Sequence, residues 1–255
     1  MKNDEYISVS RIKLYRLCPR KYKFAYIDNL PKPFKPVGLA FGSAVHSAVE
    51  WLNRRLFEGE KISFEEVWKT FKTDWFSLKQ DNILFDEKED EEDIIAKAEK
   101  LLKLLHERQT NGTKIAEVET PFQIPLFDRE TGEVLPLPLR GVFDWVEDND
   151  TLVEMKTSKR AYDTSSSSNR LQLAAYEFAY KEMFDESPNI RIVNLVKTKE
   201  PKILETEVRL DDNDHKALIG AAKLFILGVK DGIFHPIKSF MCKGCEYADI
   251  CGNGV

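Results

Sequence analysis

Four cysteines are divided between the two ends of the chain, and this division constrains the fold more than any other feature of the sequence. Cys18 lies near the start, whereas Cys242, Cys245 and Cys251 form a C-x2-C-x5-C pattern in the segment CKGCEYADIC. Closely spaced thiols in an intracellular protein are typical metal ligands. A tetrahedral zinc ion and an iron–sulfur cluster both accept four cysteinates, and the spacing does not separate them. Either group would tie the C-terminal tail to the N-terminal part of the chain.

The rest of the sequence is consistent with the reducing compartment that such a site needs. The N-terminal residues MKNDEYISVS contain no apolar region of a secretory signal, and no apolar run reaches the roughly 18 residues of a membrane span. We therefore expect a cytoplasmic protein without membrane contact. If the four cysteines do not bind a metal, they are expected to be separate free thiols. The net charge of −5 excludes a surface that is basic throughout, but it allows a local basic groove.

The spacing of apolar residues predicts a helical first part followed by a mixed second part. Two short helices are expected within 8–27, and a longer one from 38 to about 59. Another helix is expected to begin at 63, and a separate one to end at about 108. Two more are expected over 170–184 and 212–229. Three or four antiparallel strands are expected in 114–157, with further strands at 190–197 and 202–210. This order predicts one α/β domain over 1–255, with a helical N-terminal part (about 8–110), a core (about 114–230) and a cysteine-rich tail (235–255).

The segment GVFDWVEDNDTLVEMKT, residues 141–157, predicts a hairpin that carries charged side chains. Because side chains alternate along a strand, Glu154 and Lys156 share a face, and the hairpin can bring Asp144 beside Glu154. Adjacent carboxylates repel one another, and a Mg²⁺ or Mn²⁺ ion between them removes the repulsion. Such an ion activates water, and Lys156 can orient that water or stabilise the developing negative charge. The alternative is a surface hairpin in which Glu154 and Lys156 form a weak ion pair.

Two further helical patterns contribute candidate residues. His46 follows Gly42 by four positions in FGSAVHSAVEW, and Gln172 precedes Tyr176 by four in LQLAAYEF, so each pair shares a helical face. Taken alone, His46 is better explained as a histidine packed at a helix boundary, and Gln172 with Tyr176 could equally be a polar pair on the surface. Basic and aromatic residues alternate near the N-terminus and suggest a track for phosphates and bases, although helix packing is the expected role of the aromatic ones. These residues are Arg11, Lys13, Arg20, Lys21 and Lys23, with Tyr15, Tyr22 and Phe24.

Taken in order, these motifs resemble the RecB-like branch of the PD-(D/E)xK nuclease superfamily. The resemblance extends from Ser8 to Cys251 and includes the opening SVSRIKLYRLCPRKYKF. Within that branch the chain looks like the iron–sulfur members, which include the AddB nuclease domain and the CRISPR-adaptation exonucleases. Phe143 stands where the superfamily motif has a proline before the aspartate.

The resemblance implies a restriction-endonuclease-like core, in which helices flank a central mixed sheet. It implies that Cys18, Cys242, Cys245 and Cys251 hold a 4Fe–4S cluster. It also implies that four groups bind the catalytic metal ion, that the lysine of the hairpin is catalytic, and that the glutamine and tyrosine of a Q-x3-Y motif support catalysis. The ligands are His46, Asp144, Glu154 and the Met155 carbonyl; the other residues are Lys156, Gln172 and Tyr176. The strand residue Glu119 also matches an acidic position near the site.

The expected function is therefore metal-dependent hydrolysis of DNA, as an exonuclease in repair, recombination, CRISPR or phage DNA processing. Single strands or duplex ends are the expected substrate, with a larger DNA-processing complex as a partner. Two alternatives stay open from the sequence. One is a cluster-bearing DNA-binding subunit that cleaves little, and the other is a zinc-binding protein that is not a nuclease.

Overall fold

The computed structural model describes residues 6–79, 82–85 and 90–252 of the chain. Its first half is helical, apart from two short strands that pair in parallel. The elements are, in order, α1 (Val9–Leu17), α2 (Pro19–Tyr22), the π-helical turn η1 (Lys23–Ile27), β1 (Lys35–Pro36), α3 (Val37–Phe57), α4 (Phe64–Leu78), β2 (Ile83–Leu84) and α5 (Glu91–Thr110). The helices expected from apolar periodicity are therefore present.

The second half combines strands with helices. Its elements are β3 (Ile115–Ile124), β4 (Leu139–Glu147), β5 (Thr151–Ser158), α6 (Ser167–Phe184), β6 (Asn189–Val196), β7 (Lys202–Val208), α7 (Asp212–Lys230), the 3-10 turn η2 (Phe240–Gly244) and α8 (Ala248–Gly252). Strands β3 to β7 form a five-stranded sheet in chain order. Strands β5 and β6 are parallel because α6 crosses over between them, and the other pairs are antiparallel.

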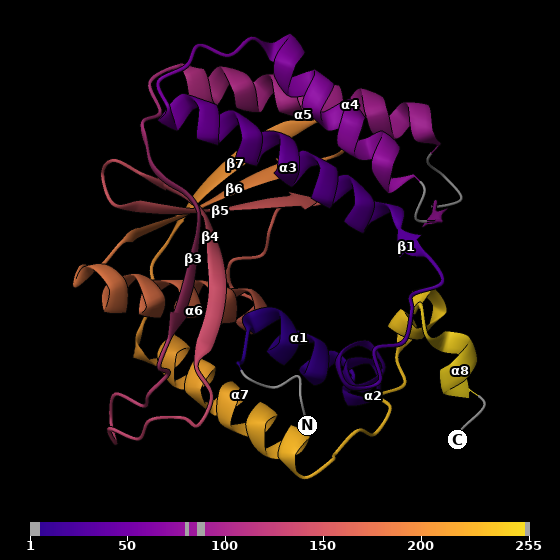
Figure 1. The fold of residues 1–255 in the computed structure, drawn as a ribbon, viewed down its shortest axis with the longest axis vertical. Coiled ribbons are helices and arrows are strands. Elements are labelled where there is room, and N and C mark those ends of the chain that lie inside the picture. The colour runs from indigo at the N-terminus through magenta and orange to yellow at the C-terminus, as the bar shows by residue number, and fades with distance from the viewer. Residues whose placement is uncertain (1–5, 80–81, 86–89, 253–255) are drawn as a thin grey trace.

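Helices cover both faces of this sheet, as Figure 1 shows. Helices α3, α4 and α5 form the layer on one face, and their apolar side chains pack on Trp145 and Val153 of the sheet. Helices α1, α6 and α7 form the layer on the other face, where Leu152 belongs to the core. The mixed sheet between two helical layers confirms the α/β, restriction-endonuclease-like fold expected from the sequence.

Helix α3 forms because its apolar residues recur at three- and four-residue intervals and so line one face. Ala40, Ala44 and Ala48 are fully buried along this face. Small side chains allow the helix to lie close to the sheet: a Cβ atom on Gly42 would lie 3.2 Å from the Thr157 hydroxyl of β5. This close approach brings the polar residues of α3 to the sheet.

Helix α1 is held firmly at both ends. The Ser8 side chain accepts a hydrogen bond from the Arg11 backbone at the N-terminus. The Tyr15 hydroxyl donates to the Ile233 carbonyl beyond α7 at 2.7 Å. Tyr15 also packs edge-to-face on Tyr22 with ring centroids 5.6 Å apart. Both tyrosines are buried, which confirms helix packing as their expected role and leaves their rings unavailable for stacking on bases.

Gly228 of α7 makes room for the Tyr15 hydroxyl, and this contact gives a testable prediction. A Cβ atom on Gly228 would overlap the hydroxyl and ring of Tyr15. We expect Gly228→Ala to lower the free energy of unfolding by about 2 kcal/mol, because overpacked sites cost 1–3 kcal/mol. Gly220→Ala is the matched control, since nothing lies within 4 Å of its Cβ position on the same helix. Denaturant unfolding should show the control unchanged or stabilised; equal losses in both variants would contradict the contact.

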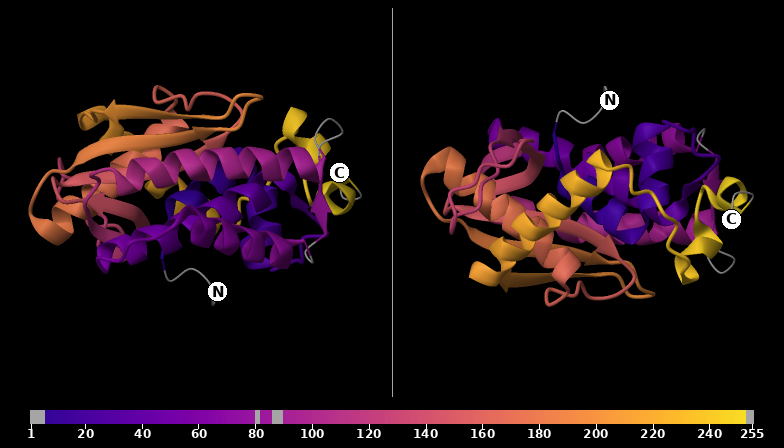
Figure 2. Two further views of the ribbon diagram at one scale, coloured as in Figure 1. Left: turned by 90° about the horizontal axis from the view of Figure 1, so that it is seen from above. Right: turned by 90° about the horizontal axis from the view of Figure 1, so that it is seen from below.

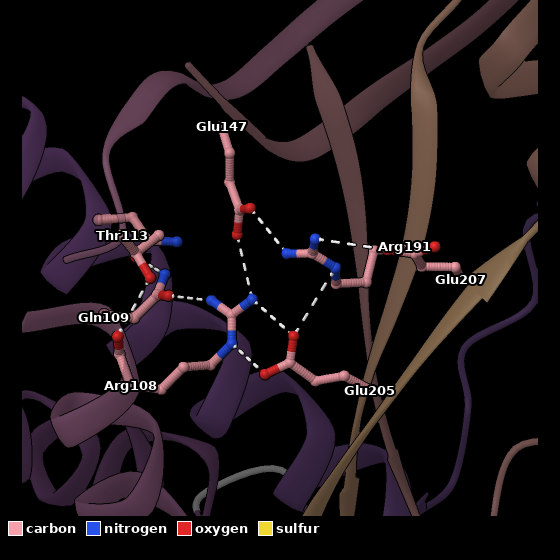
Figure 3. A network of polar contacts seen from close by, with 8 residues as sticks. Arg108, Gln109, Thr113, Glu147, Arg191, Glu205 and Glu207 are labelled. Atoms are coloured by element: carbon pink, nitrogen blue, oxygen red, sulfur yellow. Dashed lines mark hydrogen bonds and ion pairs between the residues drawn. The ribbon is translucent and has the colours of Figure 1, made fainter. Parts of the chain in front are cut away.

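A network of charged side chains joins the sheet to α5, and Figure 3 shows it from close by. Arg108 donates to Glu205 at 2.6 Å and to Glu147 at 3.1 Å. Arg191 donates to the other oxygen of Glu147 at 2.8 Å. Because Glu147 is only 7% exposed, its two arginine partners satisfy a carboxylate that would otherwise be buried without a partner. The network fixes helix α5 against β4, β6 and β7.

The C-terminal segment lies beside the N-terminal helices, as both views of Figure 2 show. Tyr247 donates to the Leu30 carbonyl at 3.2 Å, and Lys21 forms an ion pair with Glu246 at 2.6 Å. The Arg20 side chain donates to the Phe234 carbonyl at 3.0 Å. The two ends of the chain therefore meet, although residues 253–255 of the tail lie outside the described residues.

Candidate active site

The candidate site is located where β4 and β5 separate. Their antiparallel pairing ends at Trp145 and Val153, although both strands continue. Beyond this point the Met155 N–H donates to the Asp144 carboxylate at 2.7 Å instead of to a backbone carbonyl. A side chain therefore replaces the ladder hydrogen bond at the point where the two strands separate. Asp144 and Glu154 come to the same place, as the hairpin pattern predicted.

Glu154 lies at the centre of the polar contacts where β4 and β5 separate. It is only 2% exposed, and its Oε1 atom accepts from Gln172 at 2.7 Å and is also paired with the Lys156 ammonium. Its other oxygen, Oε2, is buried and has no hydrogen-bond partner within the part of the chain that the structure describes. Buried carboxylate oxygens are normally satisfied, so an unsatisfied one indicates a missing partner.

Gln172 and Tyr176 reach the site from α6. Their four-residue spacing puts both on one helical face, and the Gln172 amide nitrogen donates to the Tyr176 hydroxyl at 3.3 Å. The Gln172 carbonyl oxygen accepts from Lys156 at 3.4 Å and from Lys13 of α1 at 3.1 Å. Burial raises the pKa of Tyr176 well above its usual value, so its hydroxyl stays protonated.

His46 approaches from α3, in the opposite helical layer. Burial lowers the pKa of its imidazole, although the charge of Glu154 and a hydrogen bond to the Met155 carbonyl act in the other direction. The imidazole is therefore neutral at physiological pH, which is the form that coordinates metals. The structure thus brings together all of the predicted residues around the hairpin: His46, Asp144, Glu154, Met155, Lys156, Gln172 and Tyr176.

Two acidic residues flank these groups on the side of β3 and α3. Glu119 lies on β3 between the two residues that pair with Phe143 and Trp145, and so it lies opposite Asp144. It has a positive φ of 46°, a conformation that is uncommon outside glycine. Burial and the charge of Glu50 raise the pKa of Glu119 to about 7. Glu50 was not predicted from the sequence, although its position one helical turn after His46 could have indicated it.

The charges of the site are mutually dependent. Burial and the neighbouring Glu154 charge raise the pKa of Asp144 well above its usual value, while the Met155 N–H acts against this effect. Burial lowers the pKa of Lys156, but the charge of Glu154 and its hydrogen bond outweigh burial and leave the pKa raised. Lys156 is therefore a stable cation, whereas burial and the Glu154 charge favour the protonated form of Asp144.

The four cysteines all border the same cavity, near the C-terminal end of α1. Cys18, Cys242, Cys245 and Cys251 all line one cavity of about 590 Å³ between the N-terminal helices and the C-terminal segment. All four are free thiols, and Cys18 directly follows α1. Within 6–79, 82–85 and 90–252, no three His, Cys, Asp or Glu side chains form a group that could hold a metal ion, either here or around Glu154.

The predicted basic track is not present on the surface of the N-terminal helices. Arg11 is 6% exposed and donates to the Tyr6 carbonyl at 3.0 Å. Arg20 and Lys21 bind the C-terminal segment, and Lys23 forms an ion pair with Asp28. Lys13 instead points into the candidate site. Most residues of the predicted track therefore have partners within the chain, whereas Lys13 reaches the candidate site.

Comparison with known proteins identifies the class. A sequence profile described as the PD-(D/E)XK nuclease superfamily matches residues 6–252, so the chain belongs to this superfamily. Its members are nucleases that hydrolyse phosphodiesters, which confirms the broader part of the resemblance seen in the sequence. None of the helices in the described ranges has the length and apolar character needed to cross a membrane.

Solved structures support the fold. A candidate exonuclease from Eubacterium rectale has a TM-score of 0.61 and 19% identity, over 99% of this chain and 89% of that chain. The protein SSO0001 has a TM-score of 0.45 and 15% identity, over 100% of this chain and 89% of that one. This TM-score is too low to support a comparison of the two folds. No curated protein gives a significant match.

Proposed function

We propose that this chain is a metal-dependent deoxyribonuclease that acts as an exonuclease. The observation that carries the proposal is the Glu154 carboxylate, which is buried beside Asp144, pairs with Lys156 through one oxygen and leaves the other without a partner in the described structure. A similar fold in a candidate exonuclease from Eubacterium rectale is consistent with the exonuclease assignment.

The donor types suit a divalent cation, although the side chains as placed in the described structure do not form a three-ligand group. Asp144 and Glu154 supply hard carboxylate oxygens, the Met155 carbonyl supplies another, and His46 supplies a neutral imidazole nitrogen. Burial and then repulsion from Glu154 raise the pKa of Asp144, and a cation beside the unpartnered Glu154 oxygen would offset the repulsion. When bound, Mg²⁺ or Mn²⁺ would activate water and take up charge on the phosphate.

The other residues would orient the reacting groups. Lys156 stays protonated beside Glu154, so it can hold the attacking water or the phosphate oxygen on which negative charge develops. Gln172 donates to Glu154 and accepts from Lys156, which fixes both side chains. Tyr176 supports the Gln172 amide from the next turn of α6.

We further propose that the four cysteines hold a 4Fe–4S cluster that organises the fold. Support comes from their convergence on one cavity although Cys18 is more than two hundred residues from the others in the sequence. Zinc is the alternative, and the two differ in colour because Zn²⁺ has a filled d shell while iron–thiolate sites absorb visible light. The cluster suits a cytoplasmic protein that works as one nuclease domain in DNA repair, recombination, CRISPR or phage DNA processing, alone or within a larger complex.

Digestion of end-labelled DNA tests the proposed activity. We expect single-stranded or duplex DNA to be shortened from an end in Mg²⁺ or Mn²⁺ and to be left intact in EDTA, because the carboxylates need a cation to act. Glu154→Gln should remain folded and lose cleavage. If the protein binds DNA but cleaves no substrate with either metal, it is a DNA-binding subunit instead. Cleavage that persists in EDTA would contradict the metal-dependent mechanism.

A further inference from the structure

Lys13 is a second lysine at the candidate site, and it comes from a different part of the chain than Lys156. Its ammonium donates to the Gln172 carbonyl oxygen at 3.1 Å, and Lys156 donates to the same oxygen at 3.4 Å. Two positive groups therefore converge on one neutral amide oxygen. Since Gln172 turns its amide nitrogen to Glu154, its oxygen has to face the two lysines.

The two lysines differ in how their charges are balanced. Lys156 is paired directly with Glu154. In the structure as described, Lys13 contacts the neutral Gln172 amide, and Glu154 acts on it only from a greater distance. Burial, followed by repulsion from Lys156, lowers the pKa of Lys13 to about 8. An anion placed between the lysines would relieve this repulsion, and the phosphodiester of a nucleic acid is such an anion.

The position of Lys13 is fixed by the packing of α1. Ile12, its neighbour in the chain, is fully buried, and Tyr15 is anchored to the Ile233 carbonyl. Helix α1 packs against both α6 and α7, and residues of all three helices share one core. The ammonium is therefore held at the site before substrate arrives, which reduces the entropy lost on binding.

We propose that Lys13 is a second phosphate-binding residue of this nuclease, which contacts a phosphate oxygen of the bound strand beside Lys156. The proposal rests on the proposed nuclease function. It differs from a role in which Lys13 only orients Gln172, because direct phosphate contact contributes to substrate affinity and to its dependence on salt.

The test compares wild type, Lys13→Ala, Lys13→Arg and Arg16→Ala. Arg16 is the matched control because it is an exposed cation on the same helix. Binding of a short fluorescent oligodeoxynucleotide would be measured with Ca²⁺ in place of Mg²⁺ over a range of NaCl concentrations, together with kcat and KM in Mg²⁺. Thermal melting would show that each variant is folded.

We expect Lys13→Ala to weaken binding about tenfold and to reduce the slope of log affinity against log salt by about 1. Lys13→Arg should recover most of the affinity, and Arg16→Ala should stay within about twofold of wild type, as surface changes usually do. Equal binding by Lys13→Ala and Arg16→Ala overturns the proposal, and so does a fall in kcat with an unchanged salt slope. A wild type that neither binds nor cleaves DNA overturns the proposed function as well, and so distinguishes the two failures.

Discussion

Lys156→Ala is expected to reduce the rate of DNA cleavage about 10³-fold, because removing one preorganised electrostatic group costs 10²–10³ or more in kcat. The ammonium is held against Glu154 and Gln172, so it needs no reorganisation to meet a developing negative charge. Gln172 still donates to Glu154 in the variant, which keeps one hydrogen bond on the buried carboxylate. We therefore expect the fold to survive, and single-turnover cleavage in Mg²⁺ would measure the effect.

Lys202→Ala is the matched control for this substitution, because Lys202 is an exposed lysine at the start of β7. It should cleave at the wild-type rate. Circular dichroism would establish that the Lys156 variant keeps its helices. A folded Lys156→Ala protein that cleaves as fast as the control would remove Lys156 from the mechanism and would return the Glu154–Lys156 pair to an ordinary salt bridge.

The local elements of this fold were predictable because local interactions specify them. The Asp211 side chain accepts from the Asp214 backbone at the start of α7, and Glu66 accepts from the Ser63 backbone before α4. Such caps are visible as short sequence patterns. The parallel pairing of β5 with β6 was not predicted from strand patterns, because a buried strand has the same apolar pattern whichever neighbour it pairs with. The mixed sheet was expected only from the resemblance.

The sequence predicted the residues of the hairpin at the candidate site, but it did not predict that Lys13 of α1 and Glu50 of α3 would lie beside them. Asp144, Glu154 and Lys156 share a hairpin, so strand alternation is enough to bring them together. Lys13 and Glu50 lie far away in the sequence, and only the packing of α1 and α3 on opposite sides of the sheet brings them near Glu154. The basic N-terminal segment was misinterpreted for the same reason. Composition indicates that Arg20 and Lys21 are charged, but it does not reveal that Arg20 donates to the Phe234 carbonyl and that Lys21 pairs with Glu246 in the C-terminal segment.

Loss of one cysteine should affect the C-terminal segment more than any other part of the molecule. Between Asp231 and Gly252, Tyr247 is the one residue in the described structure that is fully buried. Polar contacts such as the Lys21–Glu246 ion pair supplement this small apolar burial, and the binding energy of the proposed cluster would add to them. Cys245→Ala is expected to remove the visible absorption and the bound iron, and to leave the segment open to proteases.

The stability loss should be measurable for the whole protein, because the proposed cluster would link this segment to Cys18, which directly follows α1. We expect the Tm to fall by at least about 5 °C, since a chain of this size loses 2–4 °C for each kcal/mol. Lys243→Ala is the control, because Lys243 is an exposed residue between Cys242 and Cys245. Elemental analysis of both variants separates the outcomes. Iron in the control and none in Cys245→Ala supports the cluster, zinc in the control supports a zinc site instead, and equal metal content in both variants means that the thiols are not ligands.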